Sequence, residues 1–476
     1  TNSHQVLFLM KKEHTLYDGS NQAYELEDMK LLNVNNYSYY VHVENNVITI
    51  KCVIPKSIDT RKLKTLCSSI ISKVKEINSE KMFKCNISGF DEETQFLLLM
   101  CLYEGNYVFS KYLTQISKDR RKQEGEEELK HNTNSASLQC IHCLNEEKIE
   151  FITTSASNID YCKDLVNSNA DEITSEYLHN ELESFAKDHS LNFHSLVGEE
   201  LLKERMNLVY EVGKSAQIPP RVVCCEYRGN PNSNSYISLV GKGLTYDTGG
   251  LNLKPTGAIE EMKLDMAGAA TTLSAFKALV DMNVKKNIVL ILGCCENSID
   301  SLSFKPGDVF FSRKGLSVEI TNTDGEGRLV LADCIDYIQE KYQPTHIIDC
   351  ATLTGACMIA LGKEAFAIFS NDNVFARKLY SSTTSTHELA WRLPIFDEHR
   401  EVLHSTIADC SNIGSGAMRR YGGASSAAAF IEQFVKKDTK WIHLDIAGAS
   451  FNSKTGGTGA GVKTLIHYVK NYYEEE

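Results

Sequence analysis

The sequence contains no long apolar run and no excess of positive charge. Its longer apolar stretches, such as Phe96–Tyr103 and Ile288–Leu292, are far shorter than the roughly 20 residues that span a bilayer. The 50 lysines and arginines are outnumbered by 62 aspartates and glutamates, which gives a net charge of −12. That charge repels the phosphates of nucleic acids and the anionic surface of membranes. We therefore expect that neither a membrane nor a nucleic acid is the main partner.

Several motifs that would point to other chemistry are missing as well. No Gly-x-Ser-x-Gly occurs anywhere, which argues against a serine hydrolase of that type. His387-Glu388 begins like the zinc-binding His-Glu-x-x-His motif, but Trp391 stands in place of the second histidine. The run Gly241-Lys242-Gly243 lacks the third glycine of a dinucleotide-binding loop. No repeat of 20–50 residues is visible, which argues against a solenoid.

The length and composition are those of an ordinary globular protein with more than one domain. The chain has 476 residues, which leaves room for two to four domains of roughly 100–200 residues each. Its 15 cysteines are dispersed and mostly embedded in apolar runs such as Val222–Cys225, so we expect reduced thiols and a cytoplasmic location. Cys140-Ile141-His142-Cys143 has no second ligand pair at finger spacing, so we do not expect a zinc module there. The apolar run Val6–Met10 is too short for a signal peptide.

The sequence predicts two parts, an α/β domain over residues 1–170 and a larger α/β catalytic domain over residues 171–476. A charged run over residues 118–131, followed by a polar stretch to residue 137, has little to bury and predicts an exposed insertion in the first domain. The helical pattern of Ser175–Lys187 predicts the helix that links the two domains.

Apolar strands and amphipathic helices alternate after Pro219-Pro220. We expect strands at Val222–Glu226, Tyr236–Val240, Ile288–Cys294, Leu316–Ile320 and Ile347–Ala351, and helices at Met266–Met282 and Gly327–Tyr342. This alternation predicts a mixed, mostly parallel central sheet with helices on both faces. Ligands of such sheets bind beyond the carboxyl ends of the strands.

Three segments place charged residues at these strand ends, namely residues 241–254, 261–270 and 322–328. They carry four carboxylates, those of Asp247, Asp265, Asp324 and Glu326. Asp265 alone could be a helix N-cap, and the last pair could be a cap with a surface ion pair. Together, four carboxylates would repel one another unless cations lay between them. Two divalent metal ions would satisfy the charges and activate a water molecule, and hydrolysis of an amide is the reaction that we expect from such a site.

These segments, with residues 349–356, 420–424 and 443–448, resemble the leucine aminopeptidase family of dinuclear-metal cytosolic aminopeptidases. The most specific motif is Asn322-Thr323-Asp324-Gly325-Glu326-Gly327-Arg328-Leu329, and the resemblance covers roughly Ser175 to Val469. It implies a metal-dependent aminopeptidase that releases leucine and other apolar residues from the N-termini of short peptides. It further implies a homohexamer, two divalent ions per subunit (Zn, Mn or Mg) and bicarbonate as the general base.

The resemblance also assigns roles to individual residues. It implies that Asp247 and Glu326 bridge the metals, that Asp324 binds the more exchangeable ion, and that Lys242 and Asp265 bind the tighter one. Lys254 would stabilise the oxyanion, and Arg328 would hold the bicarbonate. The substrate cleft would be lined by Thr352, Leu353 and Gly355 through backbone groups, and by Met262 and Ala447 as walls of an apolar pocket.

The chain departs from the family pattern at two small residues, Gly325 where alanine is usual and Thr248 where serine is common. Neither change alters a proposed ligand. Two other functions stay open at this point, a dinuclear phosphoesterase and a DNA-binding regulatory member of the family, and the net charge of −12 argues against the second.

Overall fold

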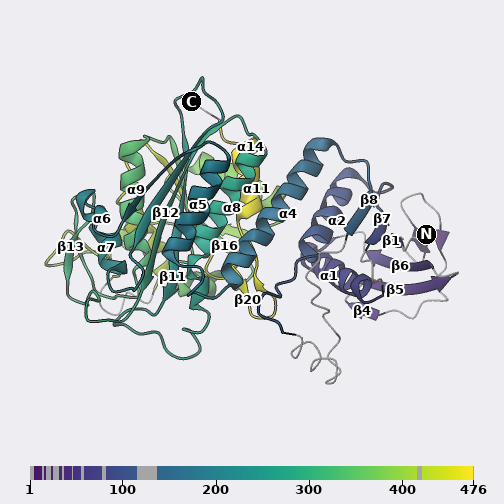
Figure 1. Ribbon diagram of the computed structural model, residues 1–476, viewed down its shortest axis with the longest axis horizontal. Helices are drawn as coiled ribbons and strands as arrows, with labels where there is room; N and C mark the ends of the chain where they lie inside the picture. Colours follow the sequence, from purple (N-terminus) through teal and green to yellow (C-terminus); the bar gives the residue numbers. More distant parts are fainter. Residues whose placement is uncertain are drawn as a thin grey trace. The chain divides into compact units, whose positions relative to one another are not determined.

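The computed structural model describes residues 58–77, 82–114, 137–414 and 421–474, together with the strand residues before position 58 (Figure 1). Contacts between residues divide the chain into two compact units, residues 1–160 and 161–476. Helix α4 (Glu146–Asn167) extends through this division, whereas the predicted linking helix is α5 (Ser175–Asp188) inside the second unit. The domain limits 1–170 and 171–476 stay a prediction. The charged run at 118–131 lies outside the described residues.

The N-terminal unit contains a sheet, two helices packed against each other and the first part of α4. Its strand order is β3-β2-β1-β6-β5-β4, with β7 beside β1 and β8 beside β7. The elements are β1 (Gln5–Lys12), β2 (Thr15–Tyr17), β3 (Ala23–Tyr24), β4 (Leu32–Val34), β5 (Tyr37–Glu44), β6 (Val47–Ile54), α1 (Thr60–Ile77), β7 (Met82–Asn86), α2 (Glu92–Gly105) and β8 (Ser137–Ile141). In α1, Leu63, Leu66 and Ile70 are buried at helical spacing, so one stripe of the helix faces the core. Asp91 caps α2 by accepting a hydrogen bond from the Thr94 amide at 2.9 Å.

The C-terminal unit is built on a mixed sheet of order β17-β16-β19-β15-β11-β12-β10-β9. Its strands are β9 (Asn192–Val197), β10 (Arg221–Arg228), β11 (Ile237–Asp247), β12 (Asn287–Asn297), β15 (His346–Ala351), β16 (Phe366–Ser370), β17 (Ala390–Arg392) and β19 (Lys440–Asp445). The four central strands, β12, β11, β15 and β19, run parallel to one another. Their residues are almost all buried, as expected for parallel strands covered on both faces. The predicted α/β fold with a mixed, mostly parallel sheet is confirmed.

Helices cover both faces of this sheet (Figure 1). Besides α5, the helices of this unit are α6 (Glu200–Lys203), α7 (Asn207–Gly213), α8 (Ala267–Asp281), α9 (Gly327–Lys341), α10 (Gly355–Leu361), α11 (Asn373–Ser385), α12 (Asp397–Glu401), α13 (Gly423–Glu432) and α14 (Val462–Asn471), with the short 3₁₀ helix η1 (Met262–Met266). Gly241 faces α8 so closely that a Cβ atom there would lie 2.4 Å from the Thr272 hydroxyl. The next residue, Lys242, points to the other face and reaches α9, where it contacts Gly327.

Three short pairings complete the unit. Strands β13 (Val309–Phe311), β14 (Ser317–Glu319) and β18 (Cys410–Ser411) form a small sheet, and β20 (Phe451–Asn452) pairs with β21 (Gly456–Gly457). In the described part of the chain, every helix is too short or too polar to cross a membrane. The last residues of the four parallel strands are Asp247, Asn297, Ala351 and Asp445. Their carboxyl ends lie at one edge of the sheet, where the predicted site residues gather.

Candidate metal centre

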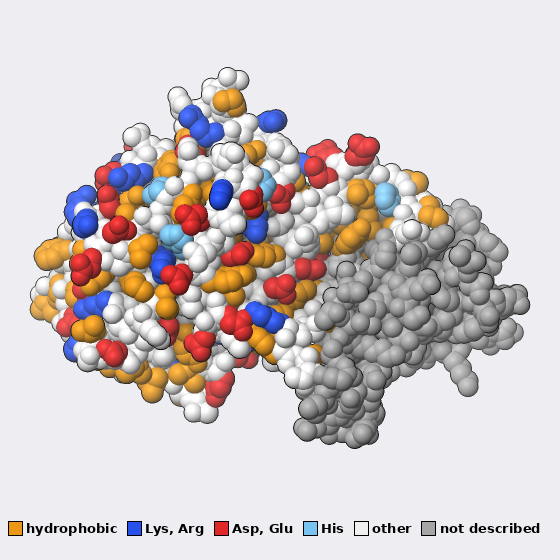
Figure 2. Space-filling model, viewed as in Figure 1, with side chains coloured by type: hydrophobic (Ala, Val, Ile, Leu, Met, Phe, Trp, Pro, Cys, Tyr) orange, Lys and Arg blue, Asp and Glu red, His pale blue; other side chains and the backbone are white. Residues whose placement is uncertain are grey.

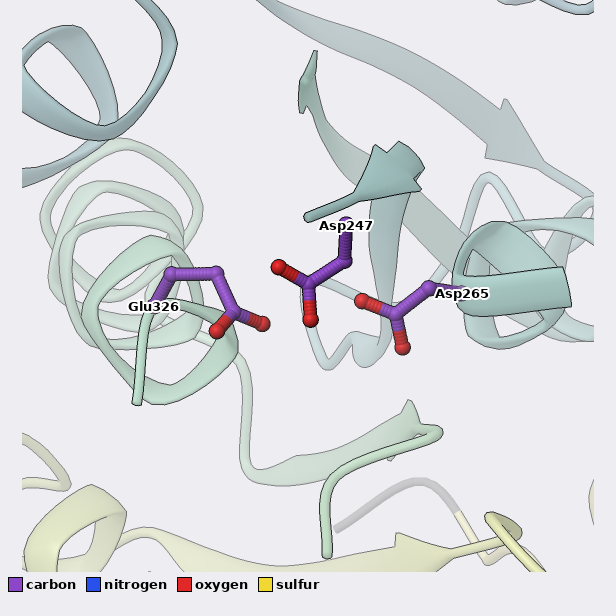
Figure 3. Close-up of side chains that lie close together, drawn as sticks. All are labelled: Asp247, Asp265 and Glu326. Atoms are coloured by element: carbon purple, nitrogen blue, oxygen red, sulfur yellow. The ribbon is translucent and has the colours of Figure 1, made fainter. Parts of the chain in front are cut away.

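Three buried carboxylates meet at this edge. Asp247, Asp265 and Glu326 each offer an oxygen that lies within 4.8 Å of those of the other two, and their side chains point toward one another in Figure 3. Each residue is at most 3% exposed. Within the described residues, this is the one group of histidine, cysteine, aspartate or glutamate side chains close enough to share a metal ion. Cys140 and Cys143 belong to no such group.

Asp247 is oriented by the loop that follows β11 and by the neighbouring strand. Its Oδ1 accepts hydrogen bonds from the Asn297 side-chain amide at 2.8 Å and from the Gly249 amide at 2.9 Å. Gly249 and Gly250 have φ of +85° and +63°, a backbone conformation that glycine adopts without steric cost. A Cβ atom at Gly249 would lie 2.6 Å from the Asn252 carbonyl oxygen. The glycines of this segment therefore allow the tight turn that carries the chain from Asp247 to Lys254.

Asp265 lies in η1 and contacts the segment that follows β15. The helix that follows it begins with small residues, and a Cβ at Gly268 would lie 2.2 Å from the Cys350 carbonyl oxygen, so α8 lies tightly against β15. Thr352 donates its hydroxyl to Asp265 Oδ1 at 2.7 Å. Because Asp265 caps no helix through its side chain, the alternative function of an N-cap is not seen.

Glu326 immediately precedes α9, and Asp324 lies two residues earlier in the same loop. Thr323 ties this loop to the one after β11, because its hydroxyl donates to the Gly249 carbonyl at 2.6 Å and its amide donates to Asn252 Oδ1 at 2.8 Å. Asp324 is the most exposed of the four predicted carboxylates, with 34% of its side chain accessible. It lies outside the group of three and joins it through a lysine.

Two lysines supply the positive charge among these carboxylates. The Lys242 ammonium lies 2.8 Å from Asp265 and 3.0 Å from Glu326, and donates to the Thr352 carbonyl at 2.9 Å. The Lys254 ammonium lies 2.8 Å from Asp247 and also contacts Asp324. Both predicted lysines are therefore in the site, as counter-ions of the acidic residues.

Charge and burial shift the pKa values of the site strongly. Burial, together with neighbouring carboxylates, raises the pKa of Asp265 to about 8 and that of Asp324 to about 6. Burial also acts to raise the pKa of Glu326, but Lys242 and Lys254 outweigh it and hold that pKa below its ordinary value. Burial acts against the charged form of Lys242, yet Asp265, Glu326 and Asp247 raise its pKa above the ordinary value.

The donor set fits divalent metal ions. Four carboxylates face two ammonium groups, so the site has a surplus of negative charge when all six groups are ionised. Glu326 Oε2 and Asn297 Oδ1 are buried and accept no hydrogen bond from any described residue. Unpaired buried oxygens next to excess negative charge are the environment that a hard divalent cation stabilises.

Arg328 lies close to this group on the second residue of α9 and is 6% exposed. Its Nη1 donates to the Asn412 carbonyl at 2.9 Å, and its Nε has no hydrogen-bond partner among the described residues. Burial lowers the pKa of Arg328 to about 10. A buried guanidinium with a free donor is suited to hold a small anion.

The predicted substrate residues lie around the ends of β15 and β19, and in η1. Met262, Leu353 and Ala447 are partly buried, and Gly355 is exposed at the start of α10. Thr352 is 5% exposed and turns its hydroxyl toward Asp265. Its backbone carbonyl is bonded to Lys242.

Two residues that the sequence did not single out hold the site together. Asn297 orients Asp247, and Asp445 accepts hydrogen bonds from the Leu353 amide at 3.1 Å and the Thr354 hydroxyl at 2.7 Å. Both are completely buried and each is the last residue of an apolar parallel strand. The signal that would have found them is the one that pointed to Asp247, a polar residue at the end of such a strand.

Comparison with known proteins agrees with this geometry. The catalytic-domain model of the cytosol aminopeptidase family matches residues 160–466. A probable cytosol aminopeptidase of Protochlamydia amoebophila is 36% identical over 397 residues, which are 80% of this chain and 76% of that protein. One of Chlamydia trachomatis serovar A is 43% identical over 318 residues, 65% of this chain and 63% of the relative.

Solved structures share the fold over the whole chain. The cytosol aminopeptidase of Coxiella burnetii has a TM-score of 0.82 at 25% identity and covers 100% of this chain and 98% of its own. The bottromycin maturation enzyme BotP in complex with Mn has a TM-score of 0.83 at 24% identity and covers 99% of both chains. None of these names supports a phosphoesterase or a DNA-binding regulator. The predicted resemblance is confirmed, and the chain belongs to the cytosol aminopeptidase family.

Proposed function

We propose that the protein is a two-metal aminopeptidase that removes leucine and other apolar residues from the N-termini of short peptides. The observation that carries this proposal is the group of three buried carboxylates, Asp247, Asp265 and Glu326, at the carboxyl edge of the parallel strands. These residues lie inside the stretch that matches the aminopeptidase family.

The proposed ligands divide between two ions. Lys242 and Asp265 would bind one ion, Asp324 the other, and Asp247 and Glu326 would lie between them. Lys242 can be a ligand only as a neutral amine, so binding of the cation must overcome the carboxylates that raise its pKa. When bound, the two ions supply Lewis-acid polarisation of the peptide carbonyl and activation of a water molecule.

Two basic side chains complete the proposed chemistry. Lys254 reaches the site from a turn on its rim, with 15% of its side chain exposed, so its ammonium can meet the oxygen of the scissile carbonyl. It would stabilise the negative charge that develops on that oxygen. Arg328 would hold a bicarbonate through the free donor at Nε, and this anion would accept the proton of the attacking water.

The substrate side of the proposal rests on the segment after β15. The Leu353 amide is already bonded to Asp445, so the backbone group of Leu353 that would bind the peptide is its carbonyl. Gly355 is exposed and leaves room for the peptide backbone. Met262 and Ala447 would bound an apolar pocket for the first side chain.

Zinc, manganese and magnesium all suit the donor set, and we propose that the native metal is one of these three. We also propose a cytoplasmic homohexamer. The C-terminal unit exposes large apolar side chains, among them Ile299, Leu302 and Phe311, and such side chains support an assembly of several subunits. Light scattering would detect this assembly. Acidic and basic side chains are interspersed on the described face in Figure 2, which gives no support to nucleic-acid binding.

One assay separates the candidate functions. Metal-free protein is supplied with Mn²⁺, Zn²⁺ or Mg²⁺ and offered leucine amide, a phosphate monoester and, on a filter at low salt, duplex DNA. We expect hydrolysis of leucine amide alone, and its loss in excess chelator. Hydrolysis of the phosphate ester without hydrolysis of leucine amide would overturn the proposal.

A further inference from the structure

The side chain of Thr352 makes contacts unlike those of a residue that simply lines a substrate cleft. Its hydroxyl donates to Asp265 Oδ1 at 2.7 Å, and its carbonyl accepts from the Lys242 ammonium at 2.9 Å. The residue is 5% exposed. Thr352 therefore contacts both members of one proposed ligand pair, and it does so with its two polar groups.

The position of Thr352 is itself set by a buried carboxylate. Asp445 Oδ1 accepts from the Leu353 amide at 3.1 Å and from the Ala447 amide at 3.2 Å, and Oδ2 accepts from the Thr354 hydroxyl at 2.7 Å. The two residues that follow Thr352 are thus tied to the end of β19. Asp445 is completely buried, so water does not compete for these hydrogen bonds.

From this chain of contacts we infer that Thr352 is a positioning residue for the Lys242–Asp265 metal site and that Asp445 holds Thr352 in place. A carboxylate with one oxygen fixed by a hydroxyl cannot rotate freely, so its other oxygen keeps one orientation. The carbonyl of Thr352 likewise limits where the Lys242 nitrogen can lie. The site is preorganised by residues that do not themselves bind the ion. The inference rests on the proposed function, in that it takes Lys242 and Asp265 as ligands.

The decisive measurement is the affinity of the metal-free protein for Mn²⁺, obtained by competition with a chelator. Thr352→Val replaces the hydroxyl with a methyl group of similar size and should weaken binding of the tighter ion roughly 10–100-fold, as loss of a partner of a metal ligand generally does. Thr352→Ser keeps the hydroxyl and should restore most of the affinity. The matched control is Thr386→Val, which removes a buried hydroxyl that bonds Ser382 and Thr464 and none of the proposed metal ligands.

Asp445→Asn tests the second contact, because the amide keeps one oxygen for the Leu353 and Ala447 amides but loses the oxygen that accepts the Thr354 hydroxyl. It should weaken Mn²⁺ binding less than Thr352→Val does, and the double variant should bind no more weakly than Thr352→Val alone, since both act through one residue. Asp333→Asn is its control, because Asp333 is a completely buried carboxylate on α9 that accepts hydrogen bonds from the backbone amides of Leu208 and Arg313.

If Asp445→Asn does not fold, Thr354→Val removes the same contact from the other side. Thr354 also caps α10, so its control is Thr174→Val, which removes the equivalent threonine cap of α5. The inference is wrong if the site variants lose thermal stability as their controls do but keep Mn²⁺ affinity within twofold of the unmodified protein. Asp265→Asn separates this failure from a failure of the proposed function. If this variant bound Mn²⁺ as tightly as the unmodified protein, Asp265 would not be a ligand and the proposed function itself would be rejected.

Discussion

Replacing Lys242 with methionine removes an ammonium group that contacts both Asp265 and Glu326 and leaves a side chain of similar length. Only 2% of the lysine side chain is exposed, so solvent does not screen these contacts. Removing one partner of a buried ion pair generally costs about 3–5 kcal/mol of stability. We expect a loss of that size in the metal-free protein.

A second estimate gives the same magnitude. Without Lys242, Glu326 can avoid an unpaired buried charge by taking up a proton. That protonation costs roughly 1.4 kcal/mol for each pH unit above a carboxyl pKa of about 4.3 in the unfolded chain, or about 4 kcal/mol at pH 7. Divalent metal restores positive charge at the same place, so saturating Mn²⁺ should reduce the loss by at least half.

The assay is urea unfolding followed by tryptophan fluorescence. The two tryptophans of the chain, Trp391 and Trp441, both lie in the C-terminal unit, so the signal reports on the unit that contains the site. Lys277→Met is the control, because the Lys277 ammonium lies 3.9 Å from the centre of the Tyr161 ring and 5.2 Å from that of the Phe185 ring. It should cost no more than about 2 kcal/mol, with or without metal. Equal losses for the two variants, or a loss at Lys242 that Mn²⁺ does not change, would refute the reasoning.

Two further predictions concern other parts of the C-terminal unit. Lys254→Ala should lower kcat on leucine amide roughly 10²–10³-fold, with little change in KM or in metal content at saturation, because the ammonium acts mainly on the developing oxyanion. A normal kcat would reject that role. Burial raises the pKa of Asp333 to about 7, above its unfolded value of about 3.9, so the stability that this residue contributes is complete below about pH 4 and is lost as the pH rises toward 7. The difference in unfolding free energy between the unmodified protein and Asp333→Asn should therefore decline over that range in urea titrations, and a difference that rises with pH would contradict it.

The fold could be predicted from sequence because its information is local. Strands buried on both faces, such as β11 and β12, appear as continuous apolar runs, and they alternate with the long helices α8 and α9, most of whose residues are buried. The carboxylates Asp247 and Glu326 stood out because each follows directly on an apolar strand or opens a helix after one. The parallel arrangement then brings such strand ends to one edge.

What the sequence did not reveal depends on contacts between distant segments. The bond from Leu353 to Asp445 joins residues 92 positions apart, and it exists because β15 and β19 pair in parallel with Ala351 opposite Asp445. Neither residue carries a local pattern that specifies the other. The bond from the Thr352 hydroxyl to Asp265 likewise joins residues 87 positions apart.

The central claim is that these carboxylates hold two catalytic metal ions, and counting metal against activity tests it most directly. Metal-free protein is titrated with Mn²⁺ while bound metal and hydrolysis of leucine amide are measured together, for the unmodified chain and for Glu326→Ala. We expect activity to reach its plateau at two ions per chain, and the Glu326→Ala protein to keep its tryptophan fluorescence, bind fewer ions and be inactive. Full activity in excess chelator, or in Glu326→Ala, would contradict it.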